Sequence, residues 1–322
     1  MTQGDPFRFG CLIDGQWVEG TGGAFETHNP AHPDRLVGAY MAAGAVQVAQ
    51  AVGSARRAQR AWAARVPLER AGIVAAFVAE VEARAPQIAR AIVLEQGKPL
   101  AEANGEIAKS CAEARTMLGL AAQAQGEVMP AARAGFRNLV LRRPRGVIAA
   151  VSPWNFPVMT PLRKLVPALM FGNAMVIKPS EFTPASACLV AEIAQQFFPP
   201  GLVQLVNGDG RTGAALVGDA GLDGVTFTGS IDTGRRIYAA AAPSLAELSL
   251  ELGGKNAAVI HDAVDLDAAL DAISGAAFAV CGQRCTAISR ILVQRALHEG
   301  VAEGLVARGP RLPLGDGLLA GQ

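Results

Sequence analysis

The chain has 322 residues, of which 51% are hydrophobic and 18% are charged, a composition typical of a globular protein. Its length favours two domains or one large one. Lysine and arginine (29) almost balance aspartate and glutamate (28), so no strong field draws the chain to nucleic acid or to an anionic membrane. We therefore expect its partners to be small molecules or copies of itself, with no nucleic acid and no membrane.

The amino terminus and the cysteines indicate the compartment. The first ten residues, MTQGDPFRFG, lack the basic and then apolar pattern of a signal peptide, and no segment reaches the roughly 18 uncharged apolar residues of a membrane helix. The cysteines are few, odd in number and scattered, unlike a secreted disulfide framework. They are Cys11, Cys111, Cys188, Cys281 and Cys285. We expect a cytoplasmic protein with reduced thiols.

The first 120 residues predict short strands followed by helices. Residues 11–20, CLIDGQWVEG, indicate a strand or hairpin edge. Further on, Ile73, Phe77 and Val81 recur at the spacing of a buried helical stripe. We expect that helix to end at Gly97, because a glycine can adopt a left-handed cap and a proline follows two residues later.

Strands and helices alternate at short intervals through the rest of the chain. Residues 137–153 predict two strands with charged residues between them. Further strands are expected at 172–180, 201–207, 224–230, 245–254, 256–260 and 288–294, and helices at 184–197, 211–219, 231–242, 266–280 and 297–308. This alternation favours right-handed βαβ crossovers. The predicted fold is α/β, with a Rossmann-like, mostly parallel sheet, helices on both faces, and a ligand at the carboxyl ends of the strands.

Two glycine-containing turns could hold the phosphates of a dinucleotide. Residues 208–213, GDGRTG, match the G-x-G-x-x-G pattern, but no acidic residue ends a strand about twenty residues later as the ribose contact requires, so a tight turn is the alternative. In FTGSIDTG, Gly229 and Ser230 come just before a helix and could present N–H groups and a hydroxyl to a pyrophosphate. Ser230 could equally be an ordinary N-cap.

Two polar residues follow apolar strands. Lys178, in VIKPSEFTP, could bind the vicinal hydroxyls of a ribose together with Glu181; a solvated charge before a turn is the alternative. Asn155, in VSPWNFP, lies between two prolines that fix the backbone, so its amide could stabilise a developing oxyanion. A turn asparagine can also simply bond its own backbone.

A carboxylate is the next candidate. Glu251, in LELGGKN, ends a run that is too apolar for a surface strand, and it is followed by two glycines. A carboxylate that enters an apolar site suits a general base. An ion pair with Lys255 is the alternative.

The two cysteines of AVCGQRCTAISR could be a redox pair, a metal clip or a nucleophile with a core neighbour. A zinc site needs more Cys or His than lie nearby, so no metal is expected, and a helix ending near Gly282 makes a disulfide between them unusual. Cys285 follows Arg284 in a turn, where it can be exposed and a nearby cation favours the thiolate. We expect Cys285 to be the nucleophile and Cys281 a small core residue of the helix.

Five motifs in order resemble the NAD(P)-dependent aldehyde dehydrogenase family: PWNFP, KPSEFTP, FTGS, ELGGKN and GQRCTA. Upstream, LEQGKPLAEANGEI is similar to the succinate-semialdehyde dehydrogenase branch. The resemblance runs from about residue 10 to the end. It implies that an aldehyde is oxidised to the carboxylic acid through a cysteine thiohemiacetal and thioester, in a homo-oligomer.

The resemblance also implies roles for individual residues. Cys285 matches the nucleophile, Asn155 with the backbone N–H of Cys285 matches the oxyanion hole, and Glu251 matches the base that activates water. Lys164 matches a lysine near the active site, and Arg163 matches an arginine that grips a substrate carboxylate. Contacts with the cofactor are implied for Ser152, Trp154, Lys178, Ser180, Glu181, Gly208, Phe227, Gly229, Ser230 and Leu252.

Cofactor and substrate preferences can be argued from charge. Glu181 near the ribose would repel the extra phosphate of NADP, so we expect NAD, although the small Ser180 beside it leaves room for NADP. Arg163 favours a short aldehyde acid such as succinate semialdehyde. Ala279 stands where a second such arginine is expected, which leaves broad aldehyde specificity open.

The resemblance divides the chain into parts. A dinucleotide-binding domain is expected at 1–120 and 143–252, part of an oligomerisation arm at 121–142, and a shortened catalytic domain at 253–322. In the family this last domain continues well beyond the cysteine, whereas this chain ends 37 residues after Cys285. A second hypothesis is therefore a shortened, catalytically impaired relative that binds dinucleotide and exposes apolar surface. A thiol redox or acyl-carrying protein built on the two neighbouring cysteines is a third.

Overall fold

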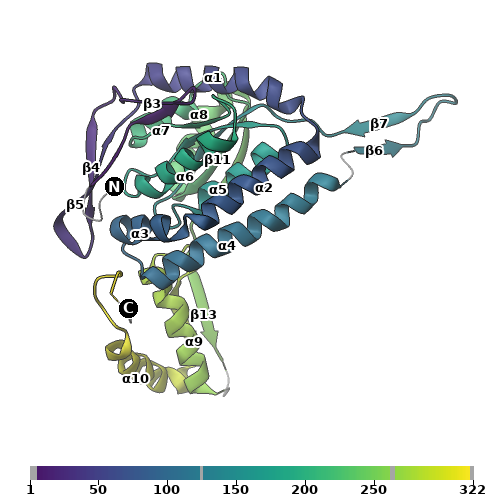
Figure 1. Ribbon diagram of the computed structural model, residues 1–322. Helices are drawn as coiled ribbons and strands as arrows, with labels where there is room; N and C mark the ends of the chain where they lie inside the picture. Colours follow the sequence, from purple (N-terminus) through teal and green to yellow (C-terminus); the bar gives the residue numbers. More distant parts are fainter. Residues whose placement is uncertain (1–5, 124–125, 262–264, 320–322) are drawn as a thin grey trace.

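The computed structural model describes residues 6–123, 126–261 and 265–319 (Figure 1). The helices are α1 Ala45–Ala63, α2 Pro67–Ala83, α3 Ala85–Gln96, α4 Leu100–Leu118, α5 Met159–Met170, α6 Pro184–Phe197, α7 Gly210–Val217, α8 Ile231–Ala241, α9 Leu266–Phe278 and α10 His298–Arg308. The strands are β1 Phe7–Phe9, β2 Cys11–Ile13, β3 Gln16–Val18, β4 Ala24–Asn29, β5 His32–Met41, β6 Gly126–Met129, β7 Asn138–Leu141, β8 Val147–Val151, β9 Ala174–Lys178, β10 Val203–Leu205, β11 Gly224–Gly229, β12 Glu247–Leu252, β13 Asn256–Ile260 and β14 Ile288–Val293. Residues 1–5, 124–125, 262–264 and 320–322 of the expected domains and arm lie outside the described residues.

A seven-stranded sheet organises the main body, in the order β12-β11-β8-β9-β10-β2-β3. The strands from β12 to β10 are parallel, and β2 joins β10 antiparallel. The chain runs from β8 outward through β9 to β10, then returns to β11 on the other side of β8. Helices α5 and α6 pack on one face, and α1, α7 and α8 on the other (Figure 1). The predicted Rossmann-like sheet is confirmed, and the reversal beside β8 marks where ligands bind in such sheets.

The turns of the first 100 residues follow the sequence signals. Residues 11–18 form the expected hairpin, with Asp14 (φ 52°) and Gly15 (φ 75°) both left-handed at the turn. Gly97 (φ 89°) caps α3 as expected. The prediction of one helix through Ile73 and up to Gly97 is wrong: α2 ends at Ala83 and α3 starts two residues later. Pro86, in the first turn of α3, cannot donate the N–H that a continuous helix would need.

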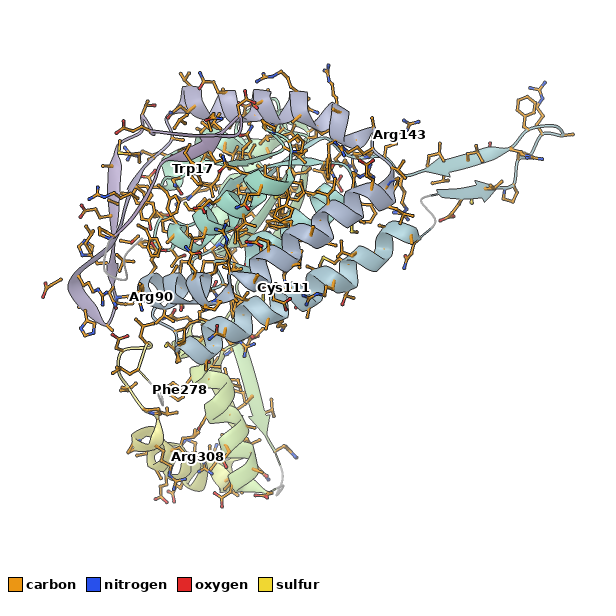
Figure 2. All side chains as sticks on the ribbon, in the orientation of Figure 1. Trp17, Arg90, Cys111, Arg143, Phe278 and Arg308 are labelled. Carbon is orange, nitrogen blue, oxygen red and sulfur yellow. The ribbon has the colours of Figure 1, made fainter. Side chains whose placement is uncertain are left out.

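Two segments lie outside the main body. Strands β6 and β7 pair as an antiparallel hairpin that projects from it (Figure 1). Strands β13 and β14 form a parallel pair that packs with α9 and α10 around its own small core of Ile260, Leu270, Ile273 and Val301. Phe278 and Arg308 mark the ends of α9 and α10 in Figure 2. We refer to residues 256–308 as the thiol segment.

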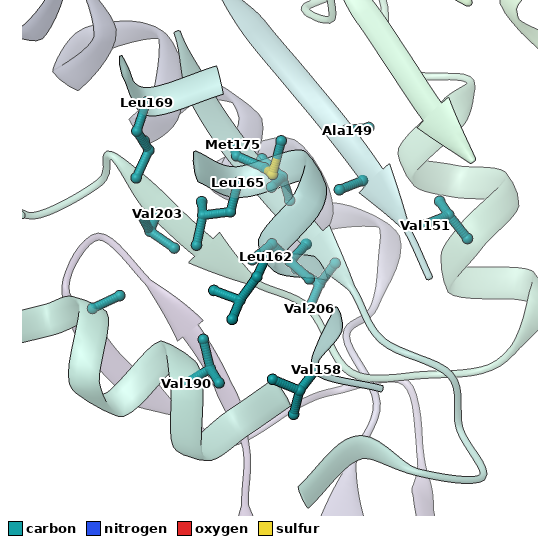
Figure 3. Packing of buried hydrophobic residues seen from close by; sticks show 14 of the residues in the cluster. Ala149, Val151, Val158, Leu162, Leu165, Leu169, Met175, Val190, Val203 and Val206 are labelled. Carbon is teal, nitrogen blue, oxygen red and sulfur yellow. The ribbon is translucent and has the colours of Figure 1, made fainter. Parts of the chain in front are cut away.

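The core between α5 and the sheet explains why this region is rigid. Leu162, Leu165 and Leu169 recur on one face of α5, are at most 2% exposed, and pack toward Met175 and Val203 of the sheet (Figure 3). Strands β8, β9 and β10 are buried almost throughout, as their continuous apolar sequences require. Within residues 6–123, 126–261 and 265–319, no helix combines the length and apolar character needed to cross a membrane.

Candidate active site

Most of the candidate residues lie at one edge of the central sheet. Parallel strands all point the same way, so the residues that follow β8, β9, β11 and β12 come together. This edge gathers Ser152, Trp154 and Asn155 after β8, Lys178 at the end of β9 with Ser180 and Glu181 behind it, Phe227, Gly229 and Ser230 at the end of β11, and Glu251 and Leu252 at the end of β12. The sequence prediction of a site at the carboxyl ends of the strands is consistent with this arrangement.

Lys178 is held by its surroundings. Its side chain is 5% exposed, and its Nζ donates to the carbonyls of Pro179 (2.7 Å) and Gly208 (2.6 Å). The carboxylate of Glu181 lies 3.5 Å from the same nitrogen. Burial lowers the pKa of Lys178, and the Glu181 carboxylate opposes that shift. The interpretation of Lys178 as a solvated charge is therefore wrong, and the ammonium and carboxylate form a fixed polar pair of the kind that binds vicinal hydroxyls.

The G-x-G-x-x-G stretch is a tight turn at Gly208 and Asp209 that leads into the first turn of α7. Gly208 has φ 143°, and a Cβ there would lie 2.1 Å from Thr212 Oγ1, so glycine is required by the tight backbone. Asp209 caps α7 by accepting from the backbone N–H of Arg211 at 2.8 Å. That carboxylate takes the position at the helix N-terminus where a phosphate would bind. Gly208 holds Lys178 through its carbonyl, and its expected contact with the cofactor stays a prediction.

The β11–α8 turn is open to a phosphate. Ser230 is exposed and caps α8, accepting from the backbone N–H of Thr233 at 3.2 Å. At Gly229 a Cβ would lie 2.4 Å from the ring of Phe227, so only glycine lets the backbone pass this close. The side chains of Trp154 and Leu252 are each 40% exposed near the same edge. Backbone N–H groups at a helix N-terminus bind anions, and exposed apolar side chains can contact a planar base.

Ser152 adds a hydroxyl to this edge. Its Oγ is buried and has no hydrogen-bond partner among the described residues, and its backbone N–H donates to the carbonyl of Lys178 at 3.1 Å. A buried hydroxyl without a partner is uncommon in a finished site. Together with the Lys178–Glu181 pair and the Ser230 turn, it leaves polar groups at this edge that are compatible with a dinucleotide.

Cys285 lies between α9 and β14 and is exposed. Two asparagine amides hold the backbone around it: Asn155 Nδ2 donates to the carbonyl of Gln283 at 2.7 Å, and Asn256 Nδ2 donates to the carbonyl of Cys285 at 2.7 Å. Asn155 therefore bonds the cysteine turn rather than its own backbone. An amide nitrogen carries two N–H groups, so Asn155 keeps one for an oxyanion.

A buried ion pair that the sequence analysis missed supports Asn155. Lys98 and Glu106 have side chains that are 0% exposed, with Lys98 Nζ 2.6 Å from Glu106 Oε2. The same Nζ donates to the carbonyl of Asn155 at 2.8 Å, and Glu106 Oε1 accepts from the N–H groups of Val158 and Met159, each at 2.9 Å. The pair thus fixes both ends of the turn that carries Asn155. Its only sequence signal is a glutamate on the apolar face of a helix.

Two charged side chains of α5 make further polar contacts. Lys164 Nζ donates to Thr226 Oγ1 at 2.8 Å, and burial lowers the pKa of Lys164 to about 8. Arg163 donates to the Glu113 carboxylate of α4, and this hydrogen bonding raises the pKa of Arg163. The expected role of Arg163 in gripping a substrate carboxylate stays a prediction.

Two sequence expectations at this site are wrong. Glu251 is exposed, because β12 is the edge strand and β11 is its one neighbour among the described strands. Cys281 is also exposed and lies outside the helix: α9 ends at Phe278, and Val280 and Cys281 adopt left-handed φ values of 57° and 55°. The chain turns sharply here, which sequence periodicity could not show.

The site is neither closed by an ion pair at Glu251 nor lined by a metal-binding cluster in the part of the chain that the structure describes. There, Glu251 and Lys255 form no ion pair, and no group of three or more His, Cys, Asp or Glu could hold a metal ion. Two surface hollows, one around Gly15 and Phe198 and one around Arg8 and Trp17, contain none of the candidate residues. Neither hollow therefore bears on the candidate site.

The chain is similar to known proteins over almost its whole length. Residues 17–321 match the aldehyde dehydrogenase family. The chain belongs to this family. As a family member it is 37% identical over 310 residues to the alpha-ketoglutaric semialdehyde dehydrogenase of Bacillus subtilis (strain 168), covering 95% of this chain and 64% of that protein. It is 36% identical over 315 residues to the NADP(+) succinate-semialdehyde dehydrogenase of Escherichia coli (strain K12), covering 97% and 65%.

A solved structure of the family superposes closely. The betaine aldehyde dehydrogenase of Staphylococcus aureus in complex with NAD+ has a TM-score of 0.94 at 30% identity, covering 97% of this chain and 63% of that one. This aldehyde dehydrogenase family chain therefore spans a little under two thirds of the length of the relatives it matches.

Proposed function

We propose that this chain carries the catalytic thiol and the cofactor site of an NAD(P)-dependent aldehyde dehydrogenase, which oxidises an aldehyde to the carboxylic acid. The observation that carries the proposal is the hydrogen bond from Asn155 Nδ2 to the Gln283 carbonyl, two residues before Cys285. It joins the thiol segment to the sheet edge where Lys178, Glu181 and Ser230 fit a dinucleotide.

The cofactor is held by groups that the fold has already fixed. Lys178 and Glu181 would hold the ribose hydroxyls, and the first turn of α8 with Ser230 would hold the pyrophosphate. The Glu181 carboxylate, 3.5 Å from Lys178 Nζ, accepts hydrogen bonds from free hydroxyls and repels an added phosphate, which favours NAD. NADP stays an alternative, since the E. coli relative is named for NADP(+).

The chemistry starts at the sulfur. The Cys285 thiolate attacks the aldehyde carbon, a C–S bond forms, and the carbonyl electron pair moves to oxygen as a thiohemiacetal oxyanion. The free N–H of the Asn155 amide and the backbone N–H of Cys285 hold that charge. A bound nicotinamide would supply the acceptor for the hydride of the same carbon, which would leave a thioester on Cys285.

Hydrolysis of the thioester needs a base. Glu251 removes a proton from a water molecule that attacks the thioester carbon; the carboxylic acid leaves and the thiolate of Cys285 returns. Because Glu251 is exposed at the end of β12, water can reach it. Lys164, bonded to Thr226 on the neighbouring strand, places a positive charge beside that carboxylate.

Assembly and domain limits belong to the same proposal. The projecting β6–β7 hairpin exposes Val128, Leu139 and Leu141 by 72%, 60% and 62%, which supports an arm that contacts another copy in a homo-oligomer. The separate small core of the thiol segment supports a domain boundary near Gly253. The aldehyde substrate is a small molecule, with a semialdehyde one candidate, and the cytoplasm stays the expected compartment.

A catalytically impaired, dinucleotide-binding relative is the second candidate. It is favoured by the exposure of Cys285 and Glu251, because groups that work in a reaction are usually shielded from bulk water. It predicts binding of NAD without turnover.

Two measurements separate the candidates. The purified chain is incubated with NAD and a panel of aldehydes that includes succinate semialdehyde, and reduced cofactor is followed by absorbance; melting temperature is measured with and without NAD. If the wild-type chain reduces NAD in the presence of an aldehyde and the variant Cys285→Ala does not, the dehydrogenase is supported. A rise in melting temperature without any turnover supports the second candidate, since a ligand that binds only the native state stabilises it. If folded protein shows no turnover and no rise in melting temperature with NAD, both candidates are refuted.

A further inference from the structure

The guanidinium of Arg163 is occupied by a carboxylate of its own chain. Arg163 Nε donates to Glu113 Oε2 at 2.5 Å and Nη2 donates to Glu113 Oε1 at 2.7 Å. These two parallel bonds are the geometry with which an arginine grips any carboxylate. Arg163 holds the pKa of Glu113 below its usual value, so Glu113 stays ionised near neutral pH.

This pair belongs to the reacting end of the site. Arg163 is on α5, next to Lys164, whose Nζ reaches Thr226 of β11. The start of α5 is held by Glu106 of the same α4 helix, the residue whose ion pair with Lys98 supports the Asn155 turn. Helix α4 packs against α5 and delivers Glu113 to the same place. A substrate carboxylate that approaches Arg163 would therefore find its guanidinium already bound to Glu113.

We propose that Glu113 is a specificity-determining residue, and that by filling the fork of Arg163 it makes this site take uncharged aldehydes in preference to aldehydes that carry a carboxylate. This inference rests on the proposed function and narrows its substrate class. An aldehyde acid has to displace Glu113 from Arg163, or it has to accept hydrogen bonds from the remaining N–H groups of Arg163 while its own carboxylate lies beside the negative charge of Glu113. An uncharged aldehyde meets neither cost.

The other charges around the pair do not replace Arg163. Lys109 Nζ is 4.0 Å from Glu113 Oε1, beyond hydrogen-bond distance, and Lys164 Nζ donates to Thr226 Oγ1. The relatives also do not decide the substrate charge, because two are named for semialdehydes of carboxylic acids and one for betaine aldehyde, which carries a quaternary ammonium. In this chain, Glu113 is the residue that we infer decides between aldehydes with and without a carboxylate.

The first test compares an aldehyde acid with its ester. Succinate semialdehyde and its methyl ester differ in one negative charge and one methyl group, and each is titrated as a protectant of Cys285 against iodoacetamide, with modification located by mass spectrometry. We expect the ester to protect wild-type protein at the lower concentration. In Glu113→Gln we expect the acid to gain roughly tenfold relative to the ester, as one freed charged hydrogen-bonding site allows. Equal or better protection by the acid in the wild type would overturn the inference.

The second test needs no aldehyde. The ratio of the rates at which iodoacetate and iodoacetamide modify Cys285 reports the local charge. We expect Glu113→Gln to raise this ratio several-fold and Arg163→Met to lower it below wild type. Glu82→Gln is the matched control, because Glu82 forms an exposed ion pair with Arg115 of the same α4 helix, and its ratio should equal that of wild type.

Further controls distinguish a failure of the inference about Glu113 from misfolding and from a failure of the proposed function. Glu113→Asp retains the charge and should behave as wild type, so it shows whether a change comes from charge or from disturbed packing. An unchanged ratio in folded Glu113→Gln refutes the inference even if NAD turnover is observed. A raised ratio with no turnover leaves the charge control by Glu113 in place and refutes the proposed function.

Discussion

The cofactor edge and the thiol segment are built in different ways. Lys178 has a side chain 5% exposed at the end of a buried strand, backed by the large core of the main body, whereas Cys285 is exposed on a segment with a small core of its own. The thiol segment meets the main body through a few polar bonds, such as Asn155 to Gln283 and Glu102 to the N–H of Val280 at 2.9 Å. Cofactor binding should therefore tolerate single substitutions. Catalysis should be more sensitive, because it depends on the few bonds that join the thiol segment to the main body.

The sharpest separation of the two regions comes from Cys285→Ala. Removal of the nucleophile should lower turnover on the order of 10⁴-fold or more, because the covalent route is lost, while the rise in melting temperature with NAD should match wild type. Aldehyde-dependent cofactor reduction and thermal unfolding measure the two. Cys281→Ala is the control and should keep turnover; loss of activity in that variant instead would favour a thiol pair.

The support beneath Asn155 gives the next largest effect. Lys98→Met and Glu106→Gln each leave a buried charge or carbonyl without its partner, so each should lower the free energy of unfolding by about 3–5 kcal/mol. Urea unfolding measures this. Arg115→Gln breaks the exposed pair with Glu82 and should cost at most about 1 kcal/mol. Equal effects of the buried and exposed changes would contradict the assignment of the Lys98–Glu106 pair as a structural support.

Asn155→Ala tests the link between the regions. Loss of the amide should reduce turnover by about 10²–10³-fold, with the NAD-dependent rise in melting temperature retained. Asn138→Ala is the matched control, because Asn138 lies on the exposed hairpin and bonds only the Pro130 carbonyl among the described residues, at 3.1 Å. If Asn155→Ala abolished NAD stabilisation as well, the cofactor edge would not be independent of the thiol segment.

The smallest expected effect is a pH dependence from Lys164. Burial lowers its pKa in the native state to about 8 from the usual 10.5. Between these two values the unfolded chain binds more protons than the native one, so the contribution of Lys164 to stability rises with pH across this window. Below pH 8 both states are protonated and the cost of burying the charge is present in full. Melting curves of wild type and Lys164→Met from pH 7 to 10 should converge as the pH rises, and parallel curves would contradict this.

The sequence determined the parallel sheet and the place of the site. Apolar runs separated by helical periods specify the strands, and parallel strands bring their carboxyl ends to one edge whatever the details of packing. Motif residues at those ends, such as Lys178 and Ser230, could therefore be assigned correctly to that edge. Gly97 was also predictable, because a left-handed cap is a local property of the backbone.

Only the tertiary structure decided which groups touch. The exposure of Glu251 depends on β12 lying at the edge of the sheet, and the exposure of Cys281 on a left-handed turn after α9. The Lys98–Glu106 support and the Glu113–Arg163 pair join residues from different elements, and a sequence pattern carries no distance between them. Hydrogen bonds and close ion pairs form only at distances of about 3–4 Å, so these contacts, and the chemistry that depends on them, became visible only in the folded chain.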